Sequence, residues 1–162
     1  MPNSVISRAV TFGGKLHLPL WRPMEVTIRP LGNVQFEATT RGHRVVCDQP
    51  ATNGGTDKGM TPPEMLLSAL GTCAGHYAVQ YLTARNLSAE GLEIAVRAEK
   101  FKAPARLDSF CIEVLAPGLD PDHEAGLLRA VKICLVHNTL LHAPSIETVL
   151  RTSAEEPVPR PR

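Results

Sequence analysis

The sequence predicts an α+β fold with mainly antiparallel sheet, and three observations support this class. Short segments with alternating apolar residues occur in two groups, two longer apolar segments begin at clear helix-capping signals, and a last short apolar segment follows the second of these. The expected order is three strands, a helix, two strands, a helix and a strand. Strands that follow one another without a helix between them pair antiparallel, which is typical of the α+β class.

Three short strands are expected near the amino terminus, at residues 25–28, 33–40 and 44–48. In the second of them Val34, Phe36 and Ala38 alternate with polar residues. This is the period of a strand with one buried face. A turn at Arg41 and Gly42 connects the last two strands, so the segment predicts an antiparallel meander.

The first helix is expected to begin at Thr61 and to run to about residue 86. Thr61 can cap the backbone N–H of Glu64, the Glu64 carboxylate can return to the N–H of Thr61, and Pro62 suits the first helical position. The apolar face that follows is so wide that we expect a central helix covered on most sides.

Two glycines flank a cysteine in this helix. Gly71 and Gly75 lie on either side of Cys73, and each lowers helix propensity by about 1 kcal/mol. We therefore expect backbone or substrate to pack closely against this turn.

The second half of the chain predicts two strands, a helix and a final strand. Alternating residues predict strands near residues 92–98 and 110–114. A second helix is expected from its cap at Asp120, with Pro121 as its first residue, and Leu127, Val131, Cys134 and Asn138 would share one of its faces. A final strand is expected at 146–152. The expected domain organisation is an extension at 1–24, one domain at 25–152 and a disordered tail at 153–162.

Composition excludes several classes of protein. The chain has 162 residues, of which 43% are hydrophobic, and 17 basic residues against 16 acidic ones leave a net charge of +1. Nucleic acid and membrane partners are therefore disfavoured. No secretory signal or membrane-spanning segment is evident, so the cytoplasm is the expected compartment. There a pair of cysteines is typically catalytic, redox-sensing or metal-binding.

Two of the four cysteines occur in matched settings. Cys73 and Cys134 each fall within a predicted buried helix, and each is followed three residues later by a histidine, His76 or His137. A nearby imidazolium raises the thiolate fraction of a cysteine. If the two helices pack together, they build a dithiol site.

The residues alone leave other interpretations open. Cys73 and Cys134 could be inert core residues, since free cysteine is among the most buried residue types. With His76 and His137 they could also form a tetrahedral zinc site. The other two cysteines, Cys47 and Cys111, are expected to be packing residues only.

Two segments resemble one family. Residues 61–73 (TPPEMLLSALGTC) and 134–140 (CLVHNTL) are similar to the segments that carry the two cysteines of the OsmC/Ohr family, the osmotically inducible protein C and organic hydroperoxide resistance proteins. The resemblance extends over about residues 25–152 and is strongest to a less characterised OsmC-like branch. It implies an intertwined homodimer in which antiparallel sheet wraps central cysteine-bearing helices.

The implied activity is thiol-dependent reduction of organic hydroperoxides. Cys73 would be the peroxidatic thiol and Cys134 the resolving thiol, with an external thiol as reductant and no metal or organic cofactor. Glu64 corresponds to a catalytic glutamate of the family. A dimeric, non-catalytic module that binds a small apolar ligand is the alternative.

Three positions depart from the family pattern. Leu135 stands where a proline usually follows the second cysteine, and the family's active-site arginine aligns near Asn33 or Val34. Glu64 precedes Cys73 by nine residues instead of ten. Nine residues rise about 13.5 Å along a straight helix, so Glu64 would need a helix break near Gly71, a relay, or a second subunit to act on Cys73.

Because the position of the family's arginine holds no arginine here, another cation would have to activate Cys73. His76 lies one helical turn beyond Cys73 and on the same side of the helix. Arg29, Arg41 and Arg44 are the arginines of the early strands. We expect His76 or one of these arginines to lower the pKa of Cys73.

Overall fold

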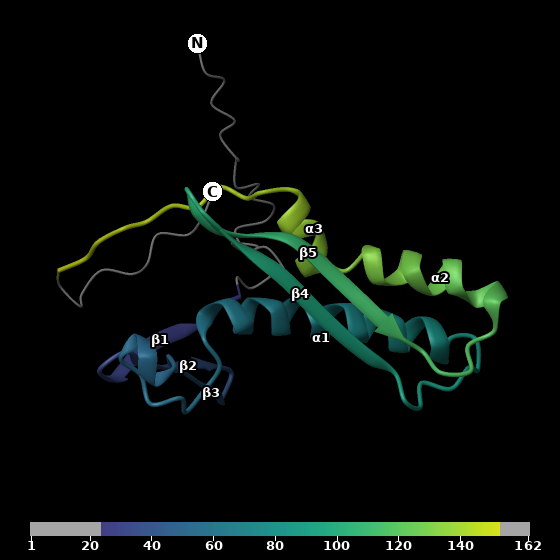
Figure 1. Cartoon of the computed structure of the whole chain (residues 1–162), viewed down its shortest axis with the longest axis horizontal. Coiled ribbons are helices and arrows are strands. Elements are labelled where there is room, and N and C mark those ends of the chain that lie inside the picture. The colour runs from purple at the N-terminus through teal and green to yellow at the C-terminus, as the bar shows by residue number, and fades with distance from the viewer. Residues whose placement is uncertain (1–23, 153–162) are drawn as a thin grey trace, which may run out of the picture. The chain divides into compact units, whose positions relative to one another are not determined.

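The computed structural model describes residues 24–152 (Figure 1). It divides into two compact units, one ending at Gly59 and the other starting at Met60. The predicted order of three strands, a helix, two strands and a helix is confirmed, and the sheets are antiparallel, as in the α+β class. The predicted extension, apart from residue 24, and the predicted tail at 153–162 lie outside the described residues. Within 24–152 no helix is both long enough and apolar enough to span a bilayer.

The first unit is the predicted meander. Strands β1 (Thr27–Gly32), β2 (Gln35–Thr40) and β3 (His43–Cys47) form one sheet in the order β1-β2-β3. Strand β1 extends beyond residue 28, where it was expected to end. It continues through Pro30, which pairs with Phe36 of β2, because β1 lies at the edge of the sheet. An edge strand tolerates a missing N–H.

A buried carboxylate holds the loop that follows β3, which includes the short helix η1 (Ala51–Asn53). Asp48 is 1% exposed. It accepts hydrogen bonds from Gln35 Nε2, from the backbone N–H groups of Gln49, Thr56 and Lys58, and from the Thr56 hydroxyl, at 2.8–3.2 Å. The loop is therefore tied to β2 and β3 through one side chain.

The second unit contains a long helix, a hairpin and two shorter helices. Helix α1 (Pro62–Thr83) is crossed by the hairpin β4 (Glu93–Lys102) and β5 (Ala105–Leu115), and α2 (Pro121–Lys132) lies along α1 (Figure 1). A short helix, α3 (Leu135–Leu141), follows. Both predicted helix starts are confirmed, by the capping box of Thr61 and Glu64 and by Asp120, whose side chain accepts from the N–H of Asp122 at 2.9 Å.

Small residues let α1 and α2 approach closely. The buried core consists of Ala74, Ala78 and Leu82 from α1 with Leu127 and Val131 from α2. Beside it, a Cβ at Gly126 would lie 2.1 Å from the Tyr81 hydroxyl. The missing side chain of Gly126 therefore makes room for the Tyr81 ring of α1 against α2.

The glycines around Cys73 are explained by β4. A Cβ at Gly71 would meet Val96 Cγ2 at 3.1 Å, and one at Gly75 would meet Ile94 Cγ1 at 3.5 Å. Close packing is therefore confirmed at Gly71, whereas the distance at Gly75 is an ordinary van der Waals contact. The packing partners are side chains of β4, and not the backbone or substrate that the sequence suggested.

Two expectations for the second unit are not met within the single chain. Helix α1 buries only the stripe from Leu70 to Leu82, while Leu66 and Val79 are 37% and 42% exposed. Residues 143–150 have no regular structure where the sequence predicts a strand from 146. Ile146 and Leu150 are each 87% exposed. A strand needs a partner for its N–H and C=O groups, and among residues 24–152 this segment has none.

The Asp48 cluster yields a prediction for stability. Burial acts to raise the pKa of the Asp48 carboxyl, but the hydrogen bonds from Thr56, Lys58 and Gln49 outweigh it and hold the pKa well below its usual range. The stability that the carboxylate contributes is present above its unfolded-state pKa of about 3.9 and is lost as the pH falls through the lower folded-state pKa. Asp48→Asn should therefore lower the thermal midpoint by several degrees at pH 7 and by less at pH 3.

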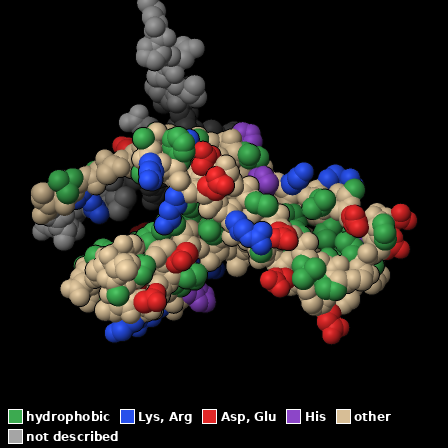
Figure 2. Space-filling model, viewed as in Figure 1, with side chains coloured by type: hydrophobic (Ala, Val, Ile, Leu, Met, Phe, Trp, Pro, Cys, Tyr) green, Lys and Arg blue, Asp and Glu red, His purple; other side chains and the backbone are tan. Residues whose placement is uncertain are grey.

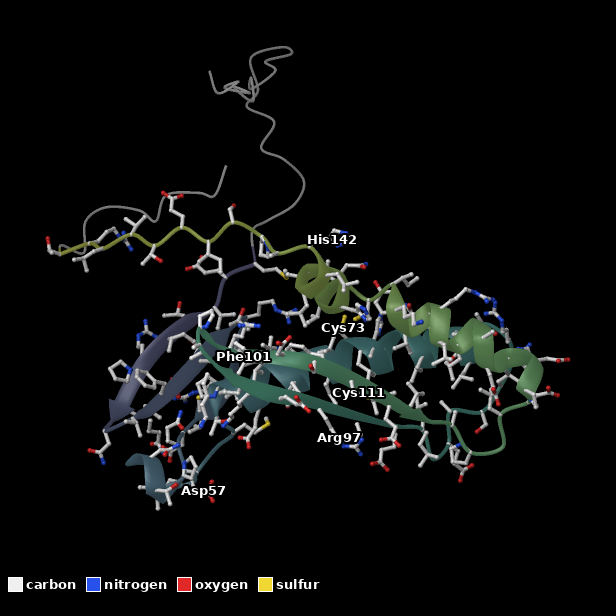
Figure 3. All side chains as sticks on the ribbon, turned by 45° about the horizontal axis from the view of Figure 1, so that its top comes forward. Asp57, Cys73, Arg97, Phe101, Cys111 and His142 are labelled. Carbon is white, nitrogen blue, oxygen red and sulfur yellow. The ribbon has the colours of Figure 1, made fainter. Side chains whose placement is uncertain are left out.

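Asp57→Asn is the matched control. Asp57 is exposed in the same loop, has φ 58°, which asparagine also tolerates, and points away from the sheet (Figure 3). Its substitution should leave the midpoint unchanged at both pH values. Equal losses for both variants in thermal scans would contradict the role given to Asp48.

Candidate functional site

The structure brings the two predicted site cysteines together. Cys73 lies in the middle of α1 and is half-buried, whereas Cys134 is 0% exposed. Their side chains are neighbours, close enough for Cys73 to raise the pKa of Cys134, and both are free thiols. Figure 3 shows Cys73 pointing from α1 toward α3. The site is therefore a dithiol pair with one partly accessible and one enclosed sulfur.

Cys134 is placed by a break in the predicted second helix. The sequence predicts one helix as far as Asn138, but α2 ends at Lys132 and Cys134 is the N-cap of α3, with φ −64° and ψ 144°. Its Sγ accepts a hydrogen bond from the backbone N–H of His137 at 3.3 Å. The sulfur therefore caps the helix by accepting a backbone hydrogen bond, as the side-chain oxygen of serine or aspartate usually does at the N-cap.

The break explains a departure from the family pattern. Leu135 is the first residue of α3, and this is the helix position at which proline is most favourable. The proline that usually follows the second cysteine would mark the break in the sequence. Because Leu135 replaces it, periodicity alone predicts a continuous helix.

The surroundings of Cys134 keep its thiol protonated. Burial is the largest effect and raises the pKa of Cys134 above its ordinary value. The N–H of His137 opposes this shift, while the neighbouring Cys73 side chain adds to it through a hydrogen bond and through charge. Cys134 therefore holds its proton at neutral pH.

Glu64, the third predicted site residue, is not brought to the cysteines of its own chain. It is exposed, and its Oε2 accepts from both the N–H and the hydroxyl of Thr61 at 2.8 Å. The backbone and side-chain hydrogen bonds from Thr61 lower the pKa of the Glu64 carboxyl. Helix α1 runs without a break from Glu64 to Cys73, a rise of about 13.5 Å.

The candidate activating cations do not surround Cys73 in the second unit. His76 is exposed, and its ring packs edge-on against Tyr77 with centroids 5.6 Å apart. The three candidate arginines belong to the first unit: Arg29, Arg41 and Arg44. Residues 24–152 contain no group of three or more histidine, cysteine, aspartate or glutamate side chains close enough to bind a metal ion together. The four side chains of the possible zinc site therefore do not form a ligand cluster in this structure.

A cavity of about 560 Å³ opens between β5, α2 and α3, and the sequence does not predict it. Its wall is mostly apolar and includes Leu70 from α1, with Asp108, Lys132 and His137 as its polar members. His137 Nδ1 is buried and has no hydrogen-bond partner among the described residues. The Cys-x-x-His spacing was the one signal in the sequence that pointed to this histidine.

The remaining cysteines differ from each other. Cys47 is 8% exposed at the end of β3, as expected for a packing residue. Cys111 is exposed on β5, opposite Arg97 (Figure 3), so its expected packing role is wrong within one chain. It provides an exposed reference thiol in the same protein.

The raised pKa of Cys134 can be tested by alkylation. Burial and Cys73 both favour the protonated thiol, so the alkylation rate of Cys134 should reach half its maximum above pH 8.5, the usual thiol value, and less than about 3% of Cys134 should be thiolate at pH 7. Cys73→Ser should move the half-maximum to lower pH. Peptide-resolved mass spectrometry measures both, with Cys111 as the exposed control. A half-maximum at or below pH 8.5 in the parent would contradict the assignment.

Comparisons with known proteins agree on one family. The family model described as OsmC-like protein matches residues 55–149. A comparison with curated proteins finds no match.

Three solved structures are similar. A putative osmotic stress induced and detoxification response protein from Psychrobacter arcticus 273-4 has a TM-score of 0.66 at 16% identity over 74% of this chain and 90% of its own. An OsmC-like protein from Mycoplasma pneumoniae has a TM-score of 0.63 at 20% identity, over 75% and 89%. The organic hydroperoxide resistance protein OhrB of Bacillus subtilis has a TM-score of 0.53 at 18% identity, over 73% and 90%. Since the family model matches more than half of the 162 residues and the fold is shared, the chain belongs to the family of OsmC-like proteins.

Proposed function

We propose that the protein reduces organic hydroperoxides through a two-cysteine cycle. The observation that carries this proposal is the contact between the half-buried thiol of Cys73 and the buried thiol of Cys134 inside an OsmC-like fold. Two similar structures are organic hydroperoxide resistance proteins, from Legionella pneumophila and Bacillus subtilis. Their names support the choice of substrate class.

Cys73 performs the first step because it is the more accessible of the two thiols. Its thiolate attacks the distal oxygen of the hydroperoxide, forming an S–O bond and breaking the O–O bond. The organic oxygen leaves with the electron pair of that bond and takes up a proton to become an alcohol. Cys73 is left as a sulfenic acid.

Cys134 performs the second step from its position beside Cys73. Its sulfur attacks the sulfenic sulfur, an S–S bond forms, and the hydroxyl group leaves as water with the proton of Cys134. An external dithiol then reduces the disulfide. One turnover converts a hydroperoxide and two thiols into an alcohol, water and a disulfide, without a metal or organic cofactor.

Glu64 reaches this chemistry by one of two routes. A break in α1 near Gly71 is excluded, because the helix is continuous from Pro62 to Thr83. A relay through another residue, or contact with Cys73 of a second subunit, would give Glu64 its catalytic role. The free thiols of the cycle fit the reducing conditions of the cytoplasm.

Thiol titration tests the cycle. Two of the four cysteines per chain should be lost after one equivalent of cumene hydroperoxide and recovered with dithiothreitol. Cys73→Ser should abolish the loss, and Cys134→Ser should leave a sulfenic acid at Cys73 that dimedone traps. Cys111→Ser is the control and should still lose two thiols. No loss in the parent, or a loss that depends on Cys111, would rule out the proposed cycle.

We also propose an intertwined homodimer. The second unit leaves large apolar side chains exposed on the hairpin, on α2 and in the segment after α3, among them Leu115, Leu128, Ile146 and Leu150. Figure 2 shows hydrophobic side chains at the surface, interspersed with charged groups. The hairpin is a two-stranded sheet with both edges open among the described residues. Two-stranded sheets are marginal in isolation, so a second copy would supply the missing cover and strand partners.

The dimer should be obligate, with an interface of at least about 2,000 Å². Sedimentation at micromolar concentration should give twice the chain mass. The double substitution Ile146→Glu and Leu150→Glu should raise the dissociation constant at least about tenfold, since it places two charges in an apolar contact. Glu147→Gln, between them, should leave it unchanged. A stable monomeric parent would overturn the proposal.

The cavity favours a second candidate function. Its volume of about 560 Å³ and its largely apolar wall fit a small organic ligand. A non-catalytic binding module would bind such a ligand and would show no loss of thiols with peroxide, so the titration separates the two functions.

A further inference from the structure

We propose that the external dithiol reduces the oxidised protein by attacking one sulfur only, that of Cys73. A thiolate of the reductant forms a mixed disulfide with Cys73 and expels Cys134, whose sulfur never meets the reductant. This inference rests on the proposed function, because the disulfide between the two cysteines is a product of the proposed cycle. The reductant is thereby assigned a binding atom and a side of approach on α1.

Cys134 is closed to an external thiol. Its exposed fraction is 0%, so an attacking sulfur, which is larger than a water molecule, finds no surface to approach. Cys134 lies in the turn between α2 and α3, where its sulfur accepts the N–H of His137 at 3.3 Å. The rate of thiol–disulfide exchange depends on access to the sulfur that is attacked. The enclosure of Cys134 therefore directs the reductant to the other sulfur of the disulfide.

Cys73 is the sulfur that an external thiol can reach. It is half-buried in the middle of α1. Ala69 and His76 lie about one helical turn before and after it on the same side of α1, and both are exposed. Residues 69–76 contain no carboxylate, lysine or arginine, so this strip of the helix does not select a thiol by its charge. The open side of Cys73 is therefore the strip between Ala69 and His76.

The direction of attack agrees with this access. In thiol–disulfide exchange the attacking sulfur approaches along the S–S bond, from the side opposite the sulfur that leaves. Cys134 is the enclosed neighbour of Cys73, so the leaving sulfur lies on the inner side of the bond and the reductant approaches Cys73 from the outer side. Attack on Cys134 would instead have to come from within the packed turn between α2 and α3.

The reduction takes two exchange steps. In the first, a thiolate of the dithiol forms a bond to the Cys73 sulfur, the bond between Cys73 and Cys134 breaks, and Cys134 leaves with its electron pair. Cys134 then takes up a proton, because burial raises its pKa. In the second step the other thiolate of the dithiol attacks the reductant sulfur of the mixed disulfide. Cys73 leaves as a thiolate, and the reductant leaves as a cyclic disulfide.

The test identifies the cysteine that carries the reductant. Diamide, which needs no peroxidase activity, forms the disulfide between Cys73 and Cys134 in full-length Cys111→Ser protein. Mercaptoethanol, a monothiol that cannot close a ring, is then added briefly and quenched with acid. N-ethylmaleimide in denaturant blocks the freed thiol, and peptide-resolved mass spectrometry locates both groups. Mercaptoethanol should be on Cys73 and the maleimide on Cys134. The reverse pattern should be at least about tenfold rarer, because an enclosed sulfur is reached only by local opening.

The same exchange in denaturant is the matched control. Both sulfurs are then exposed, so the two adducts should form in comparable amounts. Should the mixed disulfide close again before the quench, two variants in the Cys111→Ser background decide through the reverse reaction. Cys134→Ser, which keeps Cys73, should exchange with hydroxyethyl disulfide at least about tenfold faster than Cys73→Ser, which keeps Cys134.

The inference is overturned if the folded protein carries mercaptoethanol on Cys134 or equally on both cysteines, if the preference is the same in denaturant, or if diamide does not link the two cysteines. Equal rates for the two variants in the reverse reaction overturn it as well. If the adduct is on Cys73 but peroxide consumes no thiols, the assignment of the attacked sulfur stands and the peroxidase proposal fails. If peroxide consumes two thiols and the adduct is on Cys134, the cycle stands and this inference fails.

Discussion

The close packing of α1 against α2 determines where the two thiols lie. Ala74 and Ala78 of α1 pack with Leu82, Leu127 and Val131 in the buried core, and Gly126 makes room for the Tyr81 ring. Burying each leucine contributes about 1.5–3 kcal/mol. This contact holds the carboxyl end of α2 beside the middle of α1, so that the turn after α2 delivers Cys134 to Cys73.

The turn after α2 then makes the two thiols unequal. Cys134 caps α3, is fully enclosed and stays protonated, while Cys73 projects from the side of a helix and is partly open. A peroxidatic thiol has to meet substrate, and a resolving thiol has only to meet its neighbour. The difference in burial therefore suits the two roles proposed for Cys73 and Cys134.

The same turn links the thiols to the cavity. His137 gives its backbone N–H to Cys134, and its side chain is part of the cavity wall. Apolar surface left open on α1, the hairpin and residues 143–150 supports a second subunit as part of the functional protein. Residues 143–150 have no strand partner among the described residues, and the proposed second subunit would supply one.

Local sequence signals determined the fold class, the early meander and both helix starts, and they singled out Cys73 and Cys134, whose side chains are neighbours in the structure. Capping by Thr61 and Asp120 involves neighbours within three residues, and strand alternation has a fixed period. Tertiary structure decided the rest. The break at Cys134 carries no proline signal, and Asp48, the glycine contacts and the cavity at His137 depend on residues distant in the chain. Periodicity shows which face of an element is apolar, but only packing decides what covers that face and what stays unpaired.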